Sequence, residues 1–138
     1  MAGKRYLTNN RGQAIVETAL ILPVIVLLLF AIMEFGQIFN QYIVVTAAAR
    51  EGARAAAVSD DAAAQLAIVN ATTSISNSGL SVAIVYPEGG REQGKSVTVT
   101  VSKPIEVNTP MIKEIIDSVF AGRPPMLVGR SVMRVEQP

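Results

Sequence analysis

The hydrophobic residues of this chain are concentrated in one run near its N-terminus. No side chain is charged from Thr18 to Met33, and residues 14–16 and 35–39 on either side extend the apolar stretch to roughly 20 residues. A helix of that length crosses about 30 Å of hydrocarbon at about 1.5 Å per residue. The run is apolar on every face, whereas a surface helix of a soluble domain shows a polar stripe. The pattern therefore predicts a membrane-spanning helix rather than a buried helix of a soluble domain.

This helix is expected to be retained rather than removed as a secretory signal. Small residues that a signal peptidase could use occur at 47–49, but these alanines lie well beyond the apolar core, after several polar side chains. Lys4, Arg5 and Arg11 precede the run with no acidic residue among them. By the positive-inside rule, the N-terminus is predicted to lie in the cytoplasm and the rest of the chain outside the inner membrane.

Beyond the membrane, the helix is predicted to continue to about Val58. Ala48, Gly52 and Ala56 recur every four residues in this part and form a stripe of small side chains that lets another helix approach closely. The close partner is either a helix of another subunit or the chain's own domain.

Two arginines in the same stretch are candidates for polar contacts. Arg50 and Arg54 stand four residues apart, and Glu51 stands three residues before Arg54. They either dock an acidic partner or form a solvated face with one weak ion pair, and exposed pairs contribute little to stability.

Two shorter helices are expected after this point. Ser59 or Asp60 is a suitable N-cap for a helix over residues 62–74, whose apolar positions include Leu66, Ile68 and Val69. Thr109 is expected to cap a second helix over residues 110–121, which has a proline at its first position.

The remaining hydrophobic positions alternate with polar ones, which is typical of strands. The clearest alternation places Val97, Val99 and Val101 on one face. The predicted strands cover residues 80–86, 96–102 and 127–135. We therefore predict an α+β fold, in which a long N-terminal helix leads into a small three-stranded antiparallel sheet with a short helix on it.

Composition and charge exclude several functions. The 138 residues include no Cys and no His, so thiol catalysis, Cys or His metal sites and His general-base chemistry are excluded. A net charge of +1 does not favour a nucleic-acid partner. Glu88 and Glu92 lie on a predicted glycine-rich loop, where solvation explains them without catalysis. We expect no enzyme activity, no metal or other cofactor and no small-molecule substrate.

The most specific motif is a glycine followed five residues later by a carboxylate at the edge of the apolar run. If a protease cuts after Gly12, Gln13 becomes the N-terminus and Glu17 the fifth residue. Positions one and five lie on nearly the same helix face. In a bundle of such helices, the terminal ammonium of one subunit can meet the Glu17 carboxylate of a neighbour and fix the axial register. Otherwise Glu17 snorkels to the interface or pairs with Arg11.

This arrangement resembles the processing site of type IV-like prepilins, and the residues around it are similar to the TadE-like family of tight-adherence (Flp-type) pilus systems. The similarity lies in Ala-Ile-Val-Glu-Thr-Ala-Leu-Ile-Leu-Pro-Val from residue 14, in Glu34-Phe35-Gly36, and in Ala-Ala-Ala-Arg-Glu-Gly-Ala-Arg-Ala-Ala from residue 47. It covers about residues 11–57. Thr18 departs from the pattern, because related prepilins carry an aromatic residue after the glutamate, and this argues against a major pilin.

The resemblance implies a minor pilin-like subunit, or pseudopilin, that acts in pilus assembly, initiation or tip structure. It implies a cytoplasmic leader over residues 1–12, a transmembrane and stalk helix over 13–58, and a small extracytoplasmic domain over 59–138. The implied partners are the inner membrane, a prepilin peptidase and other pilins of the same system. The alternative is a bitopic membrane-anchored binding module that never polymerises.

Overall fold

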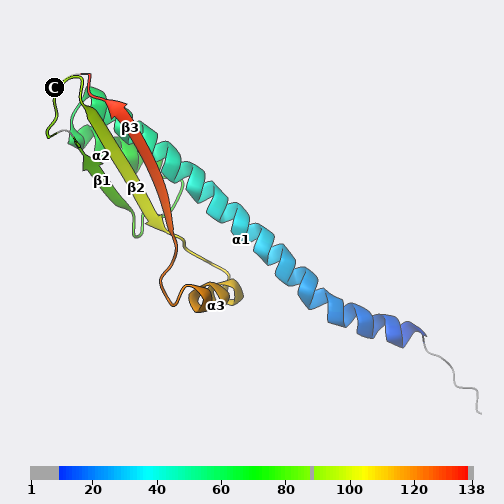
Figure 1. Ribbon diagram of the computed structural model, residues 1–138. Coiled ribbons are helices and arrows are strands. Elements are labelled where there is room, and N and C mark those ends of the chain that lie inside the picture. The colour runs from blue at the N-terminus through cyan, green and yellow to red at the C-terminus, as the bar shows by residue number, and fades with distance from the viewer. Residues whose placement is uncertain (1–9, 88, 137–138) are drawn as a thin grey trace, which may run out of the picture.

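The chain forms one very long helix with a small α+β domain packed on its C-terminal half (Figure 1). The computed structural model describes residues 10–87 and 89–136. The first nine residues of the predicted leader lie outside the described residues. The element bounds are α1 Asn10–Val58, α2 Asp61–Ala71, β1 Ser81–Val85, β2 Ser96–Pro104, α3 Pro110–Val119 and β3 Met126–Arg134.

Helix α1 has 49 residues and is therefore about 70 Å long at about 1.5 Å per residue. Pro23 lies within it without ending the helix. The N-terminal half extends away from the rest of the molecule, whereas the C-terminal half lies against the sheet (Figure 1). The predicted continuation of the membrane-spanning helix to Val58 is confirmed.

The sheet has three antiparallel strands in the order β1-β2-β3, as predicted. At its centre, Val99 pairs with Ile84 on one side and with Ser131 on the other. The alternation in β2 places Val97, Val99 and Val101 on the covered face, and all three are completely buried. The predicted strand bounds agree with the observed ones to within two residues.

The core lies between the inner face of the sheet, the C-terminal half of α1 and α2. Asp60 caps α2 by accepting a 2.7 Å hydrogen bond from the Ala63 N–H, so Asp60 is the cap of the two candidates. The buried residues of α2 are Ala64 and Ile68. The rest of the core consists of alanines and Val45 of α1, the valines of β2, and Val135 directly after β3. Small side chains on α1 let the sheet and α2 approach the helix closely, so the core is filled without large side chains.

Of the apolar positions named in α2, Ile68 is buried whereas Leu66 and Val69 are exposed, because α2 faces the core only through the stripe that contains Ile68. Two expectations about α3 are wrong. Helix α3 does not lie on the sheet but at the sheet end nearest the N-terminal half of α1 (Figure 1), because α1 and α2 already cover the apolar face. Thr109 stands at the N-cap position of α3 without making a capping hydrogen bond. Its hydroxyl donates a hydrogen bond to Glu34 of α1 instead.

Candidate functional site

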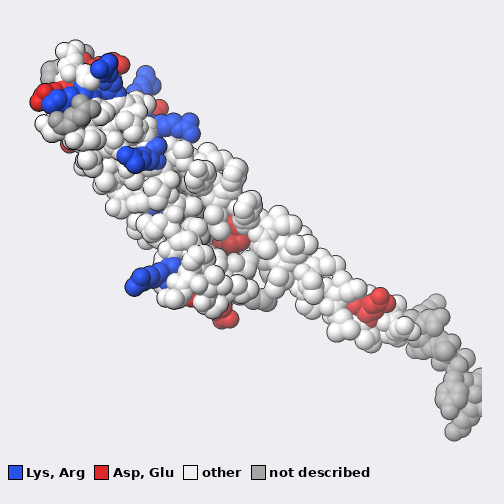
Figure 2. All heavy atoms as spheres, in the orientation of Figure 1, with Lys and Arg blue, Asp and Glu red and all other residues white. Residues whose placement is uncertain are grey.

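The largest apolar surface of the molecule is the N-terminal half of α1. No residue in its most apolar stretch is buried, and this is the only helix among the described residues that is long and apolar enough to cross a membrane. On the visible face, Figure 2 shows this half as an uncharged surface apart from one acidic spot near its N-terminal end. Exposed hydrocarbon of this extent requires lipid or protein around it. The helix is suited to act as a single-pass membrane anchor.

The glycine–glutamate motif lies on the first turns of this exposed segment. Glu17 is exposed and makes no hydrogen bond or ion pair with any residue of the described ranges 10–87 and 89–136. Gln13 lies one turn before it on the same continuous helix. The Thr18 hydroxyl donates to the Ala14 carbonyl at 2.9 Å, so this polar group is satisfied within the helix and can be accommodated in lipid.

A shallow apolar groove lies beside the motif. It has a volume of about 400 Å³ and is lined by Ala14, Ile15, Thr18, Ala19 and Leu22. A groove of this shape next to Glu17 can accept a side chain from a neighbouring helix.

The small-residue stripe lies inside the domain. Ala48 and Ala56 are completely buried, and a Cβ added to Gly52 would approach Ile68 Cδ1 to 2.6 Å and Val99 Cγ1 to 3.3 Å. The close neighbours of the stripe are therefore α2 and β2 of the same chain. The stripe positions the domain on α1, and in this structure no part of it is free for a partner helix.

The two candidate arginines are on the outer surface of α1. Arg50 and Arg54 are exposed and line a hollow of about 290 Å³ together with Ala47, Glu51 and Met133. Within the described part of the chain, neither arginine forms an ion pair, so the weak pair with Glu51 is not present. Both guanidinium groups remain accessible for a partner.

A contact that the sequence interpretation missed joins α1 to the start of α3. Glu34 is buried, and its carboxylate accepts a 3.0 Å hydrogen bond from the Asn108 N–H and a 2.8 Å hydrogen bond from the Thr109 hydroxyl. The Asn108 side-chain amide also donates to Gln37 Oε1 at 3.0 Å. We call Glu34, Asn108 and Thr109 the Glu34 latch. The carboxylate also lies at the N-terminus of α3, where a negative charge is favourable.

A second missed feature is a buried cation at the end of β2. Lys103 is completely buried and its ammonium lies 3.0 Å from Glu106 Oε1, without the geometry of a directed hydrogen bond. It continues the inward face of Val97, Val99 and Val101, because the strand extends to Pro104. The prediction ended this strand at residue 102 and so left Lys103 outside the alternation.

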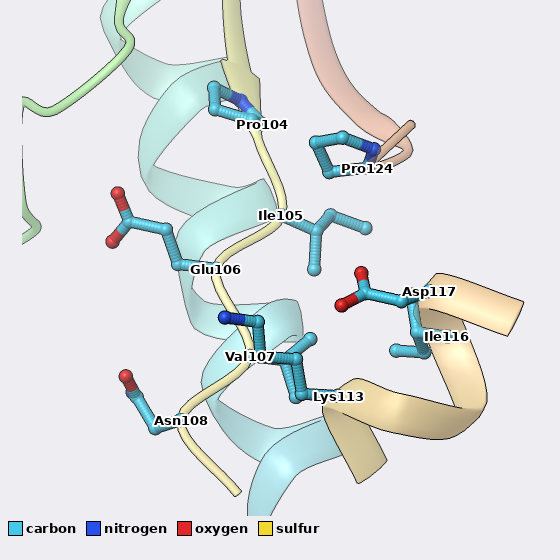
Figure 3. A pocket seen from close by; sticks show the side chains of 9 residues that line it. All are labelled: Pro104, Ile105, Glu106, Val107, Asn108, Lys113, Ile116, Asp117 and Pro124. Atoms are coloured by element: carbon cyan, nitrogen blue, oxygen red, sulfur yellow. The ribbon is translucent and has the colours of Figure 1, made fainter. Parts of the chain in front are cut away.

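The space between this strand end and α3 is an open hollow of about 420 Å³. Figure 3 shows Lys113, Ile116 and Asp117 reaching toward it from α3, with residues 104–108 on the opposite side. The lining combines prolines and aliphatic side chains with three charged side chains. No group of three or more potential metal ligands is found in the described ranges 10–87 and 89–136.

Comparison with known proteins gives one match. The family model described as TadE-like protein matches residues 12–54, which confirms the resemblance over this segment. The matched segment begins at the glycine of the processing motif and ends within the small-residue stripe. No match was found among curated proteins or solved structures. The match makes this segment similar to TadE-like proteins and covers less than half of the 138 residues.

Proposed function

We propose that this chain, TadE-like from Gly12 to Arg54, is a minor pilin-like subunit of a tight-adherence pilus that acts in assembly, initiation or tip structure. The observation that carries the proposal is the form of α1 within the matched segment. One continuous helix presents an unburied apolar half and then carries a folded domain on its other half. This form allows a subunit to be stored in a membrane and then packed with other apolar helices.

The proposed organisation has three parts. Residues 1–12 form a cytoplasmic leader, residues 13–58 a transmembrane and stalk helix, and residues 59–138 an extracytoplasmic domain. The three basic residues of the first twelve support a cytoplasmic N-terminus at the inner membrane. A prepilin peptidase cuts after Gly12, and the other partners are pilins and pseudopilins of the same system.

Glu17 supplies the subunit register in this proposal. Its carboxylate is exposed on the lipid-facing part of α1, where an unpaired charge costs roughly 2.5–3.5 kcal/mol if it reaches the bilayer centre. Cleavage after Gly12 creates an ammonium on Gln13. A neighbouring subunit's ammonium can pair with Glu17 and remove most of that cost, while the adjacent groove receives one of the neighbour's side chains.

The proposal is tested by complementation of a deletion strain that contains the cognate peptidase. We expect a mature N-terminus at Gln13 by mass spectrometry, and Gly12→Leu should block cleavage because the site needs a small residue. Glu17→Ala should be inserted and cleaved but should fail to join the pilus complex, since it leaves a buried ammonium unpaired. Glu17→Gln should fail almost as severely. The matched control is Glu51→Ala, which removes an exposed carboxylate farther along the same helix.

Two results would contradict the proposal. A native protein that keeps Met1 would favour the bitopic, non-polymerising binding module instead. Normal surface piliation and normal co-purification with other subunits by Glu17→Ala would show that the carboxylate does not hold the register.

A further inference from the structure

Helix α3 has a sharply divided surface that the fold leaves partly uncovered. Its apolar residues share one face, and its polar residues Lys113, Glu114, Asp117 and Ser118 share the other. Ile116 is half-buried, but the outer part of the apolar face is open, with Ile115 53% exposed and Val119 69% exposed. Phe120 at the end of the helix is also exposed. This face is suited to an apolar partner outside the domain.

The Glu34 latch determines where that face lies relative to the membrane. The charge-free run of α1 ends at Met33, so Glu34 is the first charged residue on the extracytoplasmic side. Asn108 and Thr109, which immediately precede α3, are hydrogen-bonded to Glu34. The start of α3 is therefore held at the level where α1 leaves the hydrocarbon. Figure 1 shows α3 on the side of the sheet that faces the N-terminal half of α1.

From this position we infer that α3 lies on the outer surface of the bilayer, with Ile115, Val119 and Phe120 inserted at the boundary between headgroups and acyl chains. An amphipathic helix with a polar face of this kind is expected to lie in the interface plane. The inference rests on membrane anchoring by α1 and does not depend on the proposed role in the pilus.

Lipid fits this face better than a charged partner does. The polar side of α3 carries one cation, Lys113, against the carboxylates of Glu114 and Asp117, so the helix has no net attraction for anionic headgroups. Its contact with the bilayer depends on burying apolar area. The lipid-facing surface of α1 is adjacent, and both surfaces belong to one chain, so α3 reaches the bilayer without a separate association step.

Docking of α3 on lipid gives the domain a second point of attachment. With α1 alone, the domain could rotate about the helix axis and tilt with it. With α3 on the surface and the Glu34 latch closed, the sheet is held in one orientation above the membrane. The two exposed arginines of α1 would then be presented in a fixed direction to other envelope proteins.

The chain contains no tryptophan, so a single introduced tryptophan reports one position without background. We would place it at Val119 in the full-length protein, reconstituted at high dilution in phosphatidylcholine vesicles whose acyl chains are brominated near the headgroup. The matched control is Val132→Trp on β3. Val132 is a similarly exposed valine near the far end of the strand from α3. Circular dichroism of both variants checks the fold, and Ile115→Trp is the second reporter if Val119→Trp is disturbed.

The expected result is strong quenching and a blue-shifted emission for Val119→Trp, with neither for Val132→Trp. Co-flotation with the vesicles confirms α1 insertion separately, so failure of the anchor is distinguishable from failure of α3 to dock. An unquenched Val119→Trp in a co-floating protein would overturn the inference. A blue shift that appears only at high protein-to-lipid ratio, without lipid quenching, would also overturn it and would assign the face to a second copy of the chain.

Discussion

The close packing of β3 on α1 depends on the absence of a side chain at Gly129. A Cβ added there would lie 2.5 Å from the Val45 carbonyl oxygen and 2.9 Å from the Thr46 Cα. These are backbone atoms of a helix and cannot rotate away. The Gly129 backbone is not in the left-handed region, so the closeness of α1 alone restricts this position to glycine.

The expected loss of stability follows from the distance by which β3 and α1 must separate to accommodate the added Cβ. An ordinary contact at this position needs a separation of about 3.4 Å, so Gly129→Ala would force β3 and α1 apart by roughly 1 Å. Such a gap loses a quarter to a half of each dispersion contact across it, and overpacking typically costs about 1–3 kcal/mol. Alanine regains roughly 0.5–1 kcal/mol in a strand. We expect a net loss of about 1 kcal/mol in the free energy of unfolding.

The assay is urea unfolding of the full-length chain in mild detergent, with the folded fraction measured by pulse proteolysis. With an m-value of about 1–3 kcal/mol/M, the midpoint should fall by roughly 0.5 M. Gly36→Ala is the matched control, because no atom lies within 4 Å of the added Cβ, and it should not lower the midpoint. If Gly129→Ala unfolds at the parent midpoint, β3 does not rest on the α1 backbone and the reasoning is refuted.

Two further predictions concern ionisable groups of the domain. Glu106→Gln should destabilise the protein by roughly 1–3 kcal/mol, because it leaves the buried Lys103 ammonium without its counter-charge. Lys103→Met should cost less, because water can reach the half-exposed Glu106. A lower urea midpoint for Lys103→Met than for Glu106→Gln would contradict this. Burial, followed by the 2.5 Å hydrogen bond that the Tyr86 hydroxyl donates to Asp61, raises the pKa of Tyr86 from 10.0 to about 12. Because the unfolded chain loses this proton first, the stability from Tyr86 is complete below pH 10 and declines between pH 10 and about 12. Tyr86→Phe should remove that part of the alkaline decline, and an absorbance titration of the phenolate should lose its highest step.

Local pattern predicted the elements because helix and strand periodicities are properties of neighbouring residues. The apolar run was sufficient to predict α1, and the alternation of valines was sufficient to predict β2 and its buried face. Similarity of the same N-terminal stretch to TadE-like proteins was also visible in the sequence and is confirmed over residues 12–54. Capping chemistry limited the N-cap of α2 to Ser59 or Asp60, and the hydrogen bond to Ala63 identifies Asp60.

Some signals were present in the sequence but not used. A carboxylate directly after an apolar run requires a partner or water, which could have marked Glu34 as a site of contact. A glycine inside a strand often indicates close approach of another backbone, as it does at Gly129. Extending the β2 alternation by one step would have placed Lys103 on the buried face.

The sequence by itself determined which residues share a face and where the membrane helix lies, since both depend on the regular geometry of one segment. The tertiary structure decided which faces meet. The Glu34 latch joins residues 74 and 75 positions apart, and no local pattern specifies that Asn108 and Thr109 are its donors. The place of α3 beside the membrane end of α1 was decided in the same way, because the apolar face of the sheet was already occupied by α1 and α2.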